Sequence, residues 1–573
     1  HKNFPAEVMF RILCRIKLRP TCPPGSFLVV SVRPYNPEGI SFIHTIERLS
    51  DRCIRINEQK KILFSESPFQ YSVSQYKQGD AAMHLHNPRS ESFSTCPVGM
   101  ATAAAVFGTA PEGPESIIID IPLKDRKDRI NKSSLYGTGW IQATEDYCRP
   151  SVPDRHFEFL YDAAVRSIIL HTPDEIYPGP FTYKRFWFRD SAFILYAMLC
   201  CGLPNIKRLI DNFRDRQRPS GYFRSQEGEW DSNGQVLWIM NQYCRFRGQP
   251  PPAEWLNMIL KGARWINRKR ISNKEATLHS GLMPAGFSAE HLGPNDYYYW
   301  DDFWSAAGLQ AAGEMLTAAG YETEAERFRA AGKDLIRAVS HSLEKTKNNR
   351  PGNAMPASPY RRMDSGAIGS IAACYPLQLF SSRDRRLTET AEYLHRHHTV
   401  NGAYFHDIIH SGINPYLTLQ LAQVFMASGD ARFIELVKSI AALASPTGQW
   451  PEAVNPRTGK GCMGDGPPLW SSAKWVIMMR NTILCEEPEN RLVIGTGIFP
   501  EWLQQNNTIG MESAPTHWGP VSVRIKPYPE KIKVECKGKW HSSRPDIEVR
   551  LPGFDRVRIN RDTNRIEIEK RIK

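Results

Sequence analysis

The stretch Phe193-Ile-Leu-Tyr-Ala-Met-Leu-Cys-Cys-Gly-Leu-Pro, residues 193–204, decides the fold of this chain. Its apolar residues cover every side of a helix, which is typical of a helix buried all round, and the Gly and Pro at its end predict a tight stop. The run Glu322-Thr-Glu-Ala-Glu-Arg-Phe-Arg also has the helical period, but it carries the charges of a surface helix. Helices of these two kinds alternate along the chain, which predicts an inner and an outer layer.

Between about Asp154 and Cys485 the apolar residues recur with the helical period, and twelve helices are predicted. Their ranges are 156–171, 187–201, 205–217, 232–247, 252–270, 302–319, 322–344, 364–376, 384–398, 413–428, 430–443 and 468–485. Connections after the even-numbered helices are short, such as Gly248-Gln-Pro-Pro, whereas most of the others are long. The pattern predicts a mainly α fold, an (α/α)6 barrel of six hairpins with the even-numbered helices inside. The long loops then gather at one mouth, over the N-termini of the inner helices, where a ligand would bind.

The regions before and after the helices show the period of two that is typical of strands. Phe27-Leu-Val-Val-Ser-Val is an example from the first region and Val521-Ser-Val-Arg-Ile is one from the last. We therefore expect an N-terminal β-sandwich and a small C-terminal β-domain around the barrel. The expected bounds are 1–130 for the sandwich, 131–155 for a linker, 156–488 for the barrel and 489–573 for the C-terminal domain.

The composition restricts the partners and the compartment. The 573 residues carry a net charge of +13, but basic and acidic residues interleave, so solvated helix faces explain the charge better than a nucleic-acid surface does. No apolar run is long enough to cross a membrane. The 12 cysteines form no CxxC pair, which favours reduced thiols and a cytoplasmic location. Because the chain starts at His1 rather than at Met, the sequence leaves open whether a signal peptide was removed.

Two loops at the predicted mouth carry carboxylates among aromatic residues. Glu452 lies in Gly448-Gln-Trp-Pro-Glu-Ala-Val-Asn-Pro, and an acidic pair follows Trp300 in Trp300-Asp-Asp. Acids before a helix often only cap it. Two carboxyl groups, one protonated and one ionised, are also the minimum needed to cleave a glycosidic bond. Other long loops repeat the combination of flat aromatics with polar groups, which suits the two faces of a sugar ring.

Three segments of the helical region resemble glycoside hydrolase family 15, the glucoamylases and their bacterial relatives. Trp187-Phe-Arg-Asp-Ser-Ala resembles a segment whose Arg and Asp bind sugar hydroxyls, so the resemblance gives that role to Arg189 and Asp190. Pro451-Glu452, followed by Leu469-Trp-Ser-Ser-Ala, is similar to the region that holds the general base, which Glu452 would supply.

The third segment, Trp300-Asp301-Asp302, is similar to Trp-Glu-Glu of the same family, whose first carboxyl is the general acid. The resemblance makes Asp301 the acid and Asp302 a residue that holds sugar hydroxyls. Here Asp replaces the Glu of family 15. Other six-hairpin families use Asp as the acid, so the chain could belong to a sister family and act on a rhamnoside, mannoside or uronide instead of an α-glucoside. Asp302 and Asp296, together with the aromatics from Tyr297 to Trp300, would raise the pKa of Asp301 by like charge and desolvation.

Several further side chains in these loops are expected to bind the sugar. They are Trp187, Glu229, Trp230, Asp231, Trp300, Trp450 and Trp470. Glu229 is also the reserve candidate for the acid. We expect neither a metal nor a cofactor.

The sequence predicts an inverting glycoside hydrolase that acts on an oligo- or polysaccharide, with Asp301 as general acid and Glu452 as general base. Inversion requires the two carboxyl groups to lie about 6.5–9.5 Å apart, with room for a water. Three alternatives stay open: a polysaccharide lyase acting on a uronate glycan, a phosphorylase, and a barrel that binds carbohydrate without catalysis. The sugar, its linkage and the oligomeric state do not follow from the sequence.

Overall fold

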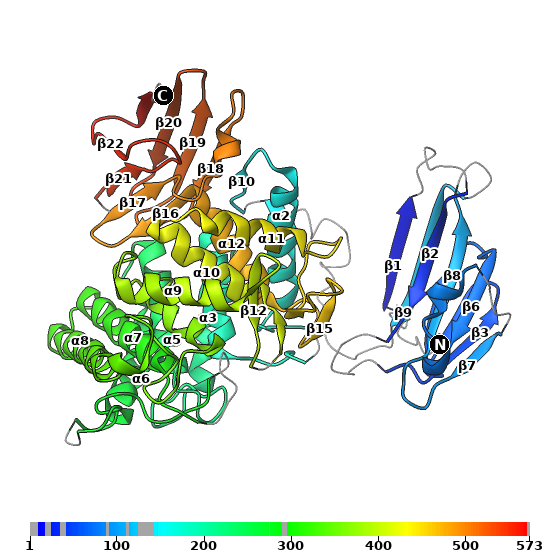
Figure 1. The fold of residues 1–573 in the computed structure, drawn as a ribbon, viewed down its shortest axis with the longest axis horizontal. Helices are drawn as coiled ribbons and strands as arrows, with labels where there is room; N and C mark the ends of the chain where they lie inside the picture. Colours follow the sequence, from blue (N-terminus) through cyan, green and yellow to red (C-terminus); the bar gives the residue numbers. More distant parts are fainter. Residues whose placement is uncertain are drawn as a thin grey trace, which may run out of the picture. The chain divides into compact units, whose positions relative to one another are not determined.

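A computed structural model describes most of the chain (Figure 1). The described ranges are 10–17, 25–34, 42–86, 91–109, 114–123, 143–145, 147–180, 182–273, 276–288, 295–408, 410–541 and 543–569. Most of the linker predicted at 131–155 lies outside them. The chain divides into two compact units, His1–Gly137 and Thr138–Lys573.

The first unit consists of two antiparallel sheets around one core. Its strands are β1 (Phe10–Lys17), β2 (Phe27–Val32), β3 (Thr45–Ser50), β4 (Cys53–Ile56), β5 (Lys60–Phe64), β6 (Gln70–Ser74), β7 (Phe93–Thr95), β8 (Thr102–Gly108) and β9 (Ser116–Leu123). One sheet has the order β1-β9-β5-β4-β3-β7 and the other β2-β8-β6. Two short 3-10 helices, η1 (Tyr76–Gln78) and η2 (Ala81–His84), follow β6.

Alternating side chains hold these two sheets together. On β4 the buried residues are Ile54 and Ile56, while their neighbours are half-buried. Phe64 of one sheet packs edge-on against Phe107 of the other, with ring centroids 5.4 Å apart. Both belong to one hydrophobic core, so the β-sandwich predicted from the period of two is present.

The second unit contains the helices, and each predicted helical segment has a helix in the structure. The helices are α2 (Arg155–His171), α3 (Phe188–Cys201), α4 (Ile206–Asp211), α5 (Ser232–Arg247), α6 (Leu256–Lys269), α7 (Tyr299–Ala318), α8 (Glu322–Lys345), α9 (Arg385–His398), α10 (Pro415–Ser428), α11 (Arg432–Ala442) and α12 (Leu469–Ile483). The 3-10 helices are η4 (Asn212–Arg216), η5 (Ala253–Trp255), η6 (Lys347–Asn349), η7 (Ser365–Ala373) and η8 (Pro500–Leu503).

Six of these helices pack in a closed ring, which we call the inner ring. In order round the ring they are α3, α5, α7, η7, α10 and α12, and α12 packs against α3 again. Almost every residue of α3 is buried, as its apolar sequence predicts, whereas α8 buries one stripe that includes Phe328 and Leu335. The other long helices pack outside the ring, so the second unit contains a helical barrel.

One predicted helix has a different form. The segment expected as an α-helix at 364–376 is the 3-10 helix η7. Its sequence, Ser-Gly-Ala-Ile-Gly-Ser-Ile-Ala-Ala, contains two glycines and two β-branched isoleucines, which lower the propensity for a regular α-helix. Asp364 caps it, accepting a hydrogen bond from the backbone N–H of Gly366 at 2.9 Å.

Two further sheets lie mainly after the helices. The order β10-β18-β19-β20-β23 joins β10 (Pro150–Ser151) to β18 (Ile509–Ala514), β19 (Val521–Pro527), β20 (Lys531–Gly538) and β23 (Arg565–Glu569). The second of these sheets has the order β16-β17-β21-β22. Its strands are β16 (Leu484–Glu487), β17 (Arg491–Ile494), β21 (Asp546–Val549) and β22 (Val557–Ile559). Their buried side chains continue the core of the barrel.

Short strands in the loops of the barrel form a fifth sheet, with the order β11-β12-β13-β14-β15. These strands are β11 (Thr399–Val400), β12 (Ala403–His406), β13 (Gly412–Ile413), β14 (Ala453–Val454) and β15 (Gly461–Met463). They bring the loop before α10 beside the loop before α12. Within the described ranges, no helix combines the length and apolar character needed to cross a membrane.

Candidate active site

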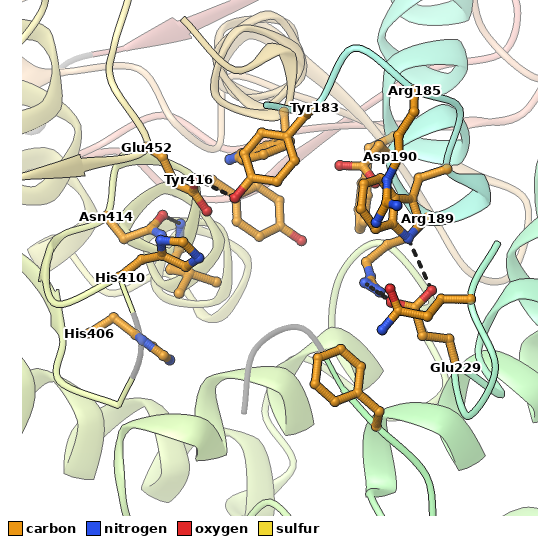
Figure 2. Close-up of a pocket in the computed structure, with 16 residues that line it drawn as sticks. Tyr183, Arg185, Arg189, Asp190, Glu229, His406, His410, Asn414, Tyr416 and Glu452 are labelled. Carbon is orange, nitrogen blue, oxygen red and sulfur yellow. Dashed lines mark hydrogen bonds and ion pairs between the residues drawn. The ribbon is translucent and has the colours of Figure 1, made fainter. Parts of the chain in front are cut away.

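A cavity of about 280 Å³ opens over the N-terminal ends of the inner ring (Figure 2). Its walls come from the loops and first turns of α3, α5, α10 and α12, together with Phe287 before α7. The lining residues are Tyr183, Arg185, Trp187, Arg189, Asp190, Phe193, Gln226, Glu229, Phe287, His406, His410, Asn414, Tyr416, Leu417, Glu452 and Trp470. The loops before five of the six ring helices therefore meet at this cavity, whereas the loop before η7 contributes none of the lining residues.

Glu452 forms part of one wall and is held by two donors. The hydroxyl of Tyr183 donates to its Oε2 at 2.8 Å, and the backbone N–H of Asp465 donates to the same oxygen at 3.3 Å. Asp465 in turn accepts from the backbone N–H of Tyr183 at 3.2 Å. Trp470 packs edge-on against the Tyr183 ring, with centroids 5.0 Å apart. The Glu452 side chain is thus fixed in position while 9% of the residue stays exposed.

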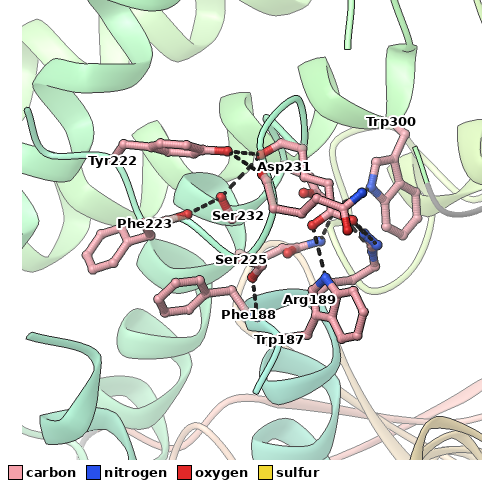
Figure 3. Close-up of polar contacts among 12 residues, drawn as sticks. Trp187, Phe188, Arg189, Tyr222, Phe223, Ser225, Asp231, Ser232 and Trp300 are labelled. Atoms are coloured by element: carbon pink, nitrogen blue, oxygen red, sulfur yellow. Dashed lines mark hydrogen bonds and ion pairs between the residues drawn. The ribbon is translucent and has the colours of Figure 1, made fainter. Parts of the chain in front are cut away.

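A cluster centred on Arg189 forms the other wall (Figures 2 and 3). Its guanidinium donates from Nη2 to Glu229 Oε1 at 2.8 Å and from Nε to Asp231 Oδ2 at 3.3 Å. The indole N–H of Trp187 donates to the second oxygen of Glu229 at 3.1 Å. Burial raises the pKa of Glu229, while Arg189 opposes the shift and the charge of Asp231 adds to it.

Asp301 lies in the first turn of α7, beside this cluster and behind the cavity wall. Only 1% of the residue is exposed, and neither carboxyl oxygen has a hydrogen-bond partner among the described residues. Burial raises its pKa well above the usual range, and the charges of Asp231 and Asp302 raise it further. The pKa shift thus has the expected direction, but its second cause is Asp231 rather than the expected Asp296. Asp301 does not line the cavity.

The neighbouring Trp300 and Asp302 do not line the cavity either. The indole N–H of Trp300 donates to Asp231 Oδ2 at 2.8 Å, so it supports the carboxylate that pairs with Arg189. Asp302 is fully buried and accepts from the backbone N–H of Met283 at 2.7 Å. Burial raises the pKa of Asp302 to about 8.

Two tryptophans expected to stack on sugar are part of the scaffold. Trp450 is buried; its indole N–H donates to the carbonyl of Ile440 at 2.7 Å, and its ring packs on Trp475. Trp230 donates to the carbonyl of Ala285 at 3.1 Å and also lies outside the cavity lining. Their indole N–H groups are thus taken up by backbone carbonyls, as buried Trp requires.

The structure brings together six of the predicted site residues around the cavity. These are Trp187, Arg189, Asp190, Glu229, Glu452 and Trp470. It also adds Tyr183 and Asp465, which hold Glu452, and His406 and His410, which line the same wall. All four occur in or beside loops that the sequence marks as polar and aromatic. Among the described residues, no group of three or more His, Cys, Asp and Glu side chains could hold a metal ion.

Neither a family model nor a curated protein matches this chain in sequence. Among solved structures, a bacterial glucoamylase complexed with acarbose matches with a TM-score of 0.52 and 13% identity, over 82% of this chain and 80% of that one. The GH78 family rhamnosidase of Bacillus sp. GL1 matches with a TM-score of 0.52 and 12% identity, over 96% of this chain and 54% of that one.

The α-L-rhamnosidase from Aspergillus terreus matches with a TM-score of 0.52 and 12% identity, over 94% of this chain and 66% of that one. This chain therefore spans about half to two thirds of the length of the two rhamnosidases. At such identities the likeness concerns the fold. It confirms the expected fold of a glucoamylase-like or sister family, a helical barrel combined with β-domains.

Proposed function

We propose that this protein is an inverting glycoside hydrolase that acts on an oligo- or polysaccharide. One observation carries the proposal: a cavity at the mouth of the barrel has a fixed carboxylate, Glu452, in one wall and an arginine–carboxylate cluster in the other (Figure 2). The fold shared with a glucoamylase and with rhamnosidases supports it. Aromatic and polar side chains that face one cavity suit a sugar ring.

Glu452 acts as the general base. Its carboxylate accepts the proton of a water that attacks the anomeric carbon, and Tyr183 and the backbone N–H of Asp465 hold it in position for that step. Because the attack comes from the face opposite to the leaving group, the anomeric configuration inverts.

Asp301 is the general acid, the group that protonates the leaving oxygen. Burial and the neighbouring carboxylates raise the pKa of Asp301 well above its usual range and so favour the protonated form, which this role requires. Glu229 is the weaker candidate although it lines the cavity, because the Arg189 guanidinium and the Trp187 indole N–H both stabilise its ionised form. This role requires the side chains between Asp301 and the cavity to move when the sugar enters, since Asp301 does not line the cavity.

The remaining cavity residues bind the sugar. Arg189 and Asp190 contact hydroxyl groups, and Trp187 and Trp470 offer ring faces. Asp231 and Trp300 act indirectly, since they hold Arg189 in place. Carbohydrate is thus the partner that this cavity fits.

The inner ring is proposed to be the inner layer of an (α/α)6 barrel. The alternation of ring helices with outer helices along the chain supports six hairpins. The domain bounds 1–130, 156–488 and 489–573 belong to the same proposal.

Leaving-group dependence tests the assignment of the acid. The dinitrophenolate of a dinitrophenyl glycoside is a good leaving group and departs without being protonated. The alkoxide of an alkyl glycoside must be protonated as it leaves. We expect Asp301→Asn to lower kcat/KM on alkyl glycosides by about 10²- to 10⁴-fold and to affect the dinitrophenyl glycoside far less. Glu452→Gln should impair both substrates. The assignment of the acid is wrong if Glu229→Gln, and not Asp301→Asn, shows the selective loss.

A lyase is the second candidate, because His406, His410 and Tyr416 line the cavity together with Arg189. Such side chains can remove the proton beside a uronate carboxyl and stabilise the charge that develops. The products separate the two functions: a lyase leaves a new carbon–carbon double bond, which is detected by ultraviolet absorbance, and a hydrolase leaves none.

A further inference from the structure

Arg185 differs from the other arginine of the cavity in that its charge is not compensated. It lines the cavity and is exposed, whereas Arg189 is buried and pairs with Glu229 and Asp231. Within the described part of the chain, Arg185 makes no ion pair and no hydrogen bond; its guanidinium lies 3.7 Å from the centre of the Trp187 ring. The rim of the cavity thus presents a cation without an anionic partner.

The stacking on Trp187 gives this cation a defined orientation. A guanidinium that lies flat on an aromatic ring keeps its N–H groups in the plane, free to meet an anion. The Trp187 ring is itself fixed, because its indole N–H donates to Glu229 at 3.1 Å. Glu229, Trp187 and Arg185 therefore form a chain of contacts that leads from the buried cluster to the rim, and little further ordering is needed when a ligand binds.

The charges are unevenly distributed along the cavity. The carboxylates that line it belong to Asp190, Glu229 and Glu452. Arg189 adds a positive charge there, and its ion pairs with Glu229 and Asp231 offset that charge. A sugar that binds among these carboxylates should be neutral, since a second anion there would be repelled. At the rim, Arg185 attracts an anion instead. The planar fork of its guanidinium matches a carboxylate.

We propose that Arg185 binds the carboxylate of a uronic acid unit on the leaving-group side of the cleaved bond. The substrate is then an acidic glycan from which a neutral sugar is released. This inference rests on the proposed hydrolase activity, because it names the substrate class of the same cavity.

The test compares substrates that differ only in that carboxyl group. Rhamnosyl- and glucosyl-glucuronic acid, in both anomeric forms, are assayed beside their carboxyl-reduced counterparts, with wild type, Arg185→Gln and Lys184→Gln. Lys184 is the matched control, because it is the adjacent exposed cation and does not line the cavity. We expect wild type and Lys184→Gln to favour the acidic substrate by about tenfold in kcat/KM. Arg185→Gln should lose that preference, and added salt should reduce it in wild type.

The possible outcomes separate this inference from the proposed function. Equal hydrolysis of acidic and reduced substrates by wild type would overturn the role of Arg185 and leave the hydrolase standing, with Arg185 only packing on Trp187. If neither substrate is cleaved, the role of Arg185 is tested by binding instead. Ligand-observed NMR then gives the dissociation constants of the acidic and the reduced ligands. A preference for the acidic ligand that disappears in Arg185→Gln supports the anion site, and equal binding of both ligands refutes it.

Discussion

Gly464 lies directly against the carboxyl group that we assign as the base, and a single methyl group there should disable it. A Cβ added at Gly464 would overlap Oε2 of Glu452 and would lie 2.5 Å from its Cδ and 2.8 Å from its Cβ. Because ordinary contact begins at 3.4 Å, the carboxyl carbon would have to move by at least about 0.9 Å, the difference between 3.4 and 2.5 Å, and the overlapping Oε2 would have to move further. A misplacement of about 1 Å can cost about 10²-fold in rate. We therefore expect Gly464→Ala to lower kcat by about 10²-fold.

Backbone strain must be separated from this displacement. Gly464 has a φ of +70°, where a residue with a side chain costs about 1–2 kcal/mol. Gly459, between β14 and β15, has a φ of +65°, but a Cβ there would meet nothing within 4 Å. Gly459→Ala should therefore lose similar stability and keep its activity. Kinetics on one glycoside together with thermal unfolding of both variants measure the two effects. Full activity in a folded Gly464→Ala protein would refute the reasoning.

Three other predictions concern buried groups. Burial raises the pKa of Asp302 to about 8, so the folded state holds a proton that the unfolded state releases above about pH 4. The free energy of unfolding should then fall by up to about 1.4 kcal/mol per pH unit from pH 4 to 8, and denaturant titrations of Asp302→Asn should lack this contribution. Trp450→Phe should lower the melting temperature and leave KM unchanged, since its indole bonds Ile440 rather than the cavity; a raised KM would restore its predicted role in binding. Glu486→Gln should cost about 3–5 kcal/mol in denaturant titrations, because it leaves the buried Arg480 unpaired; a loss below about 1 kcal/mol would contradict this.

Helix identity was largely predictable because it depends on local patterns. The all-round apolar run of α3 and the striped run of α8 indicated their positions in the inner and outer layers. The 3-10 form of η7 was not predicted, although its sequence contains Gly366 and Gly369, which lower the propensity for an α-helix. The apolar period alone does not separate the two helix types.

The site was only partly predictable, because its contacts join distant parts of the chain. Tyr183 and Glu452 are 269 residues apart, and no local pattern predicts that one donates to the other. Likewise, Trp450 and Trp470 occur in similar aromatic loops, yet one is fixed in the core and the other lines the cavity. Composition marks such loops as candidates, and only packing decides which side chains face the cavity.

The most direct test of the central claim is the anomeric configuration of the released sugar. Wild type and Glu452→Gln are incubated with a panel of glucosides, rhamnosides and uronides, and the first product is observed by proton NMR before it mutarotates. We expect a sugar of inverted configuration from wild type and no product from Glu452→Gln. A product of retained configuration, or undiminished release by the variant, would contradict it.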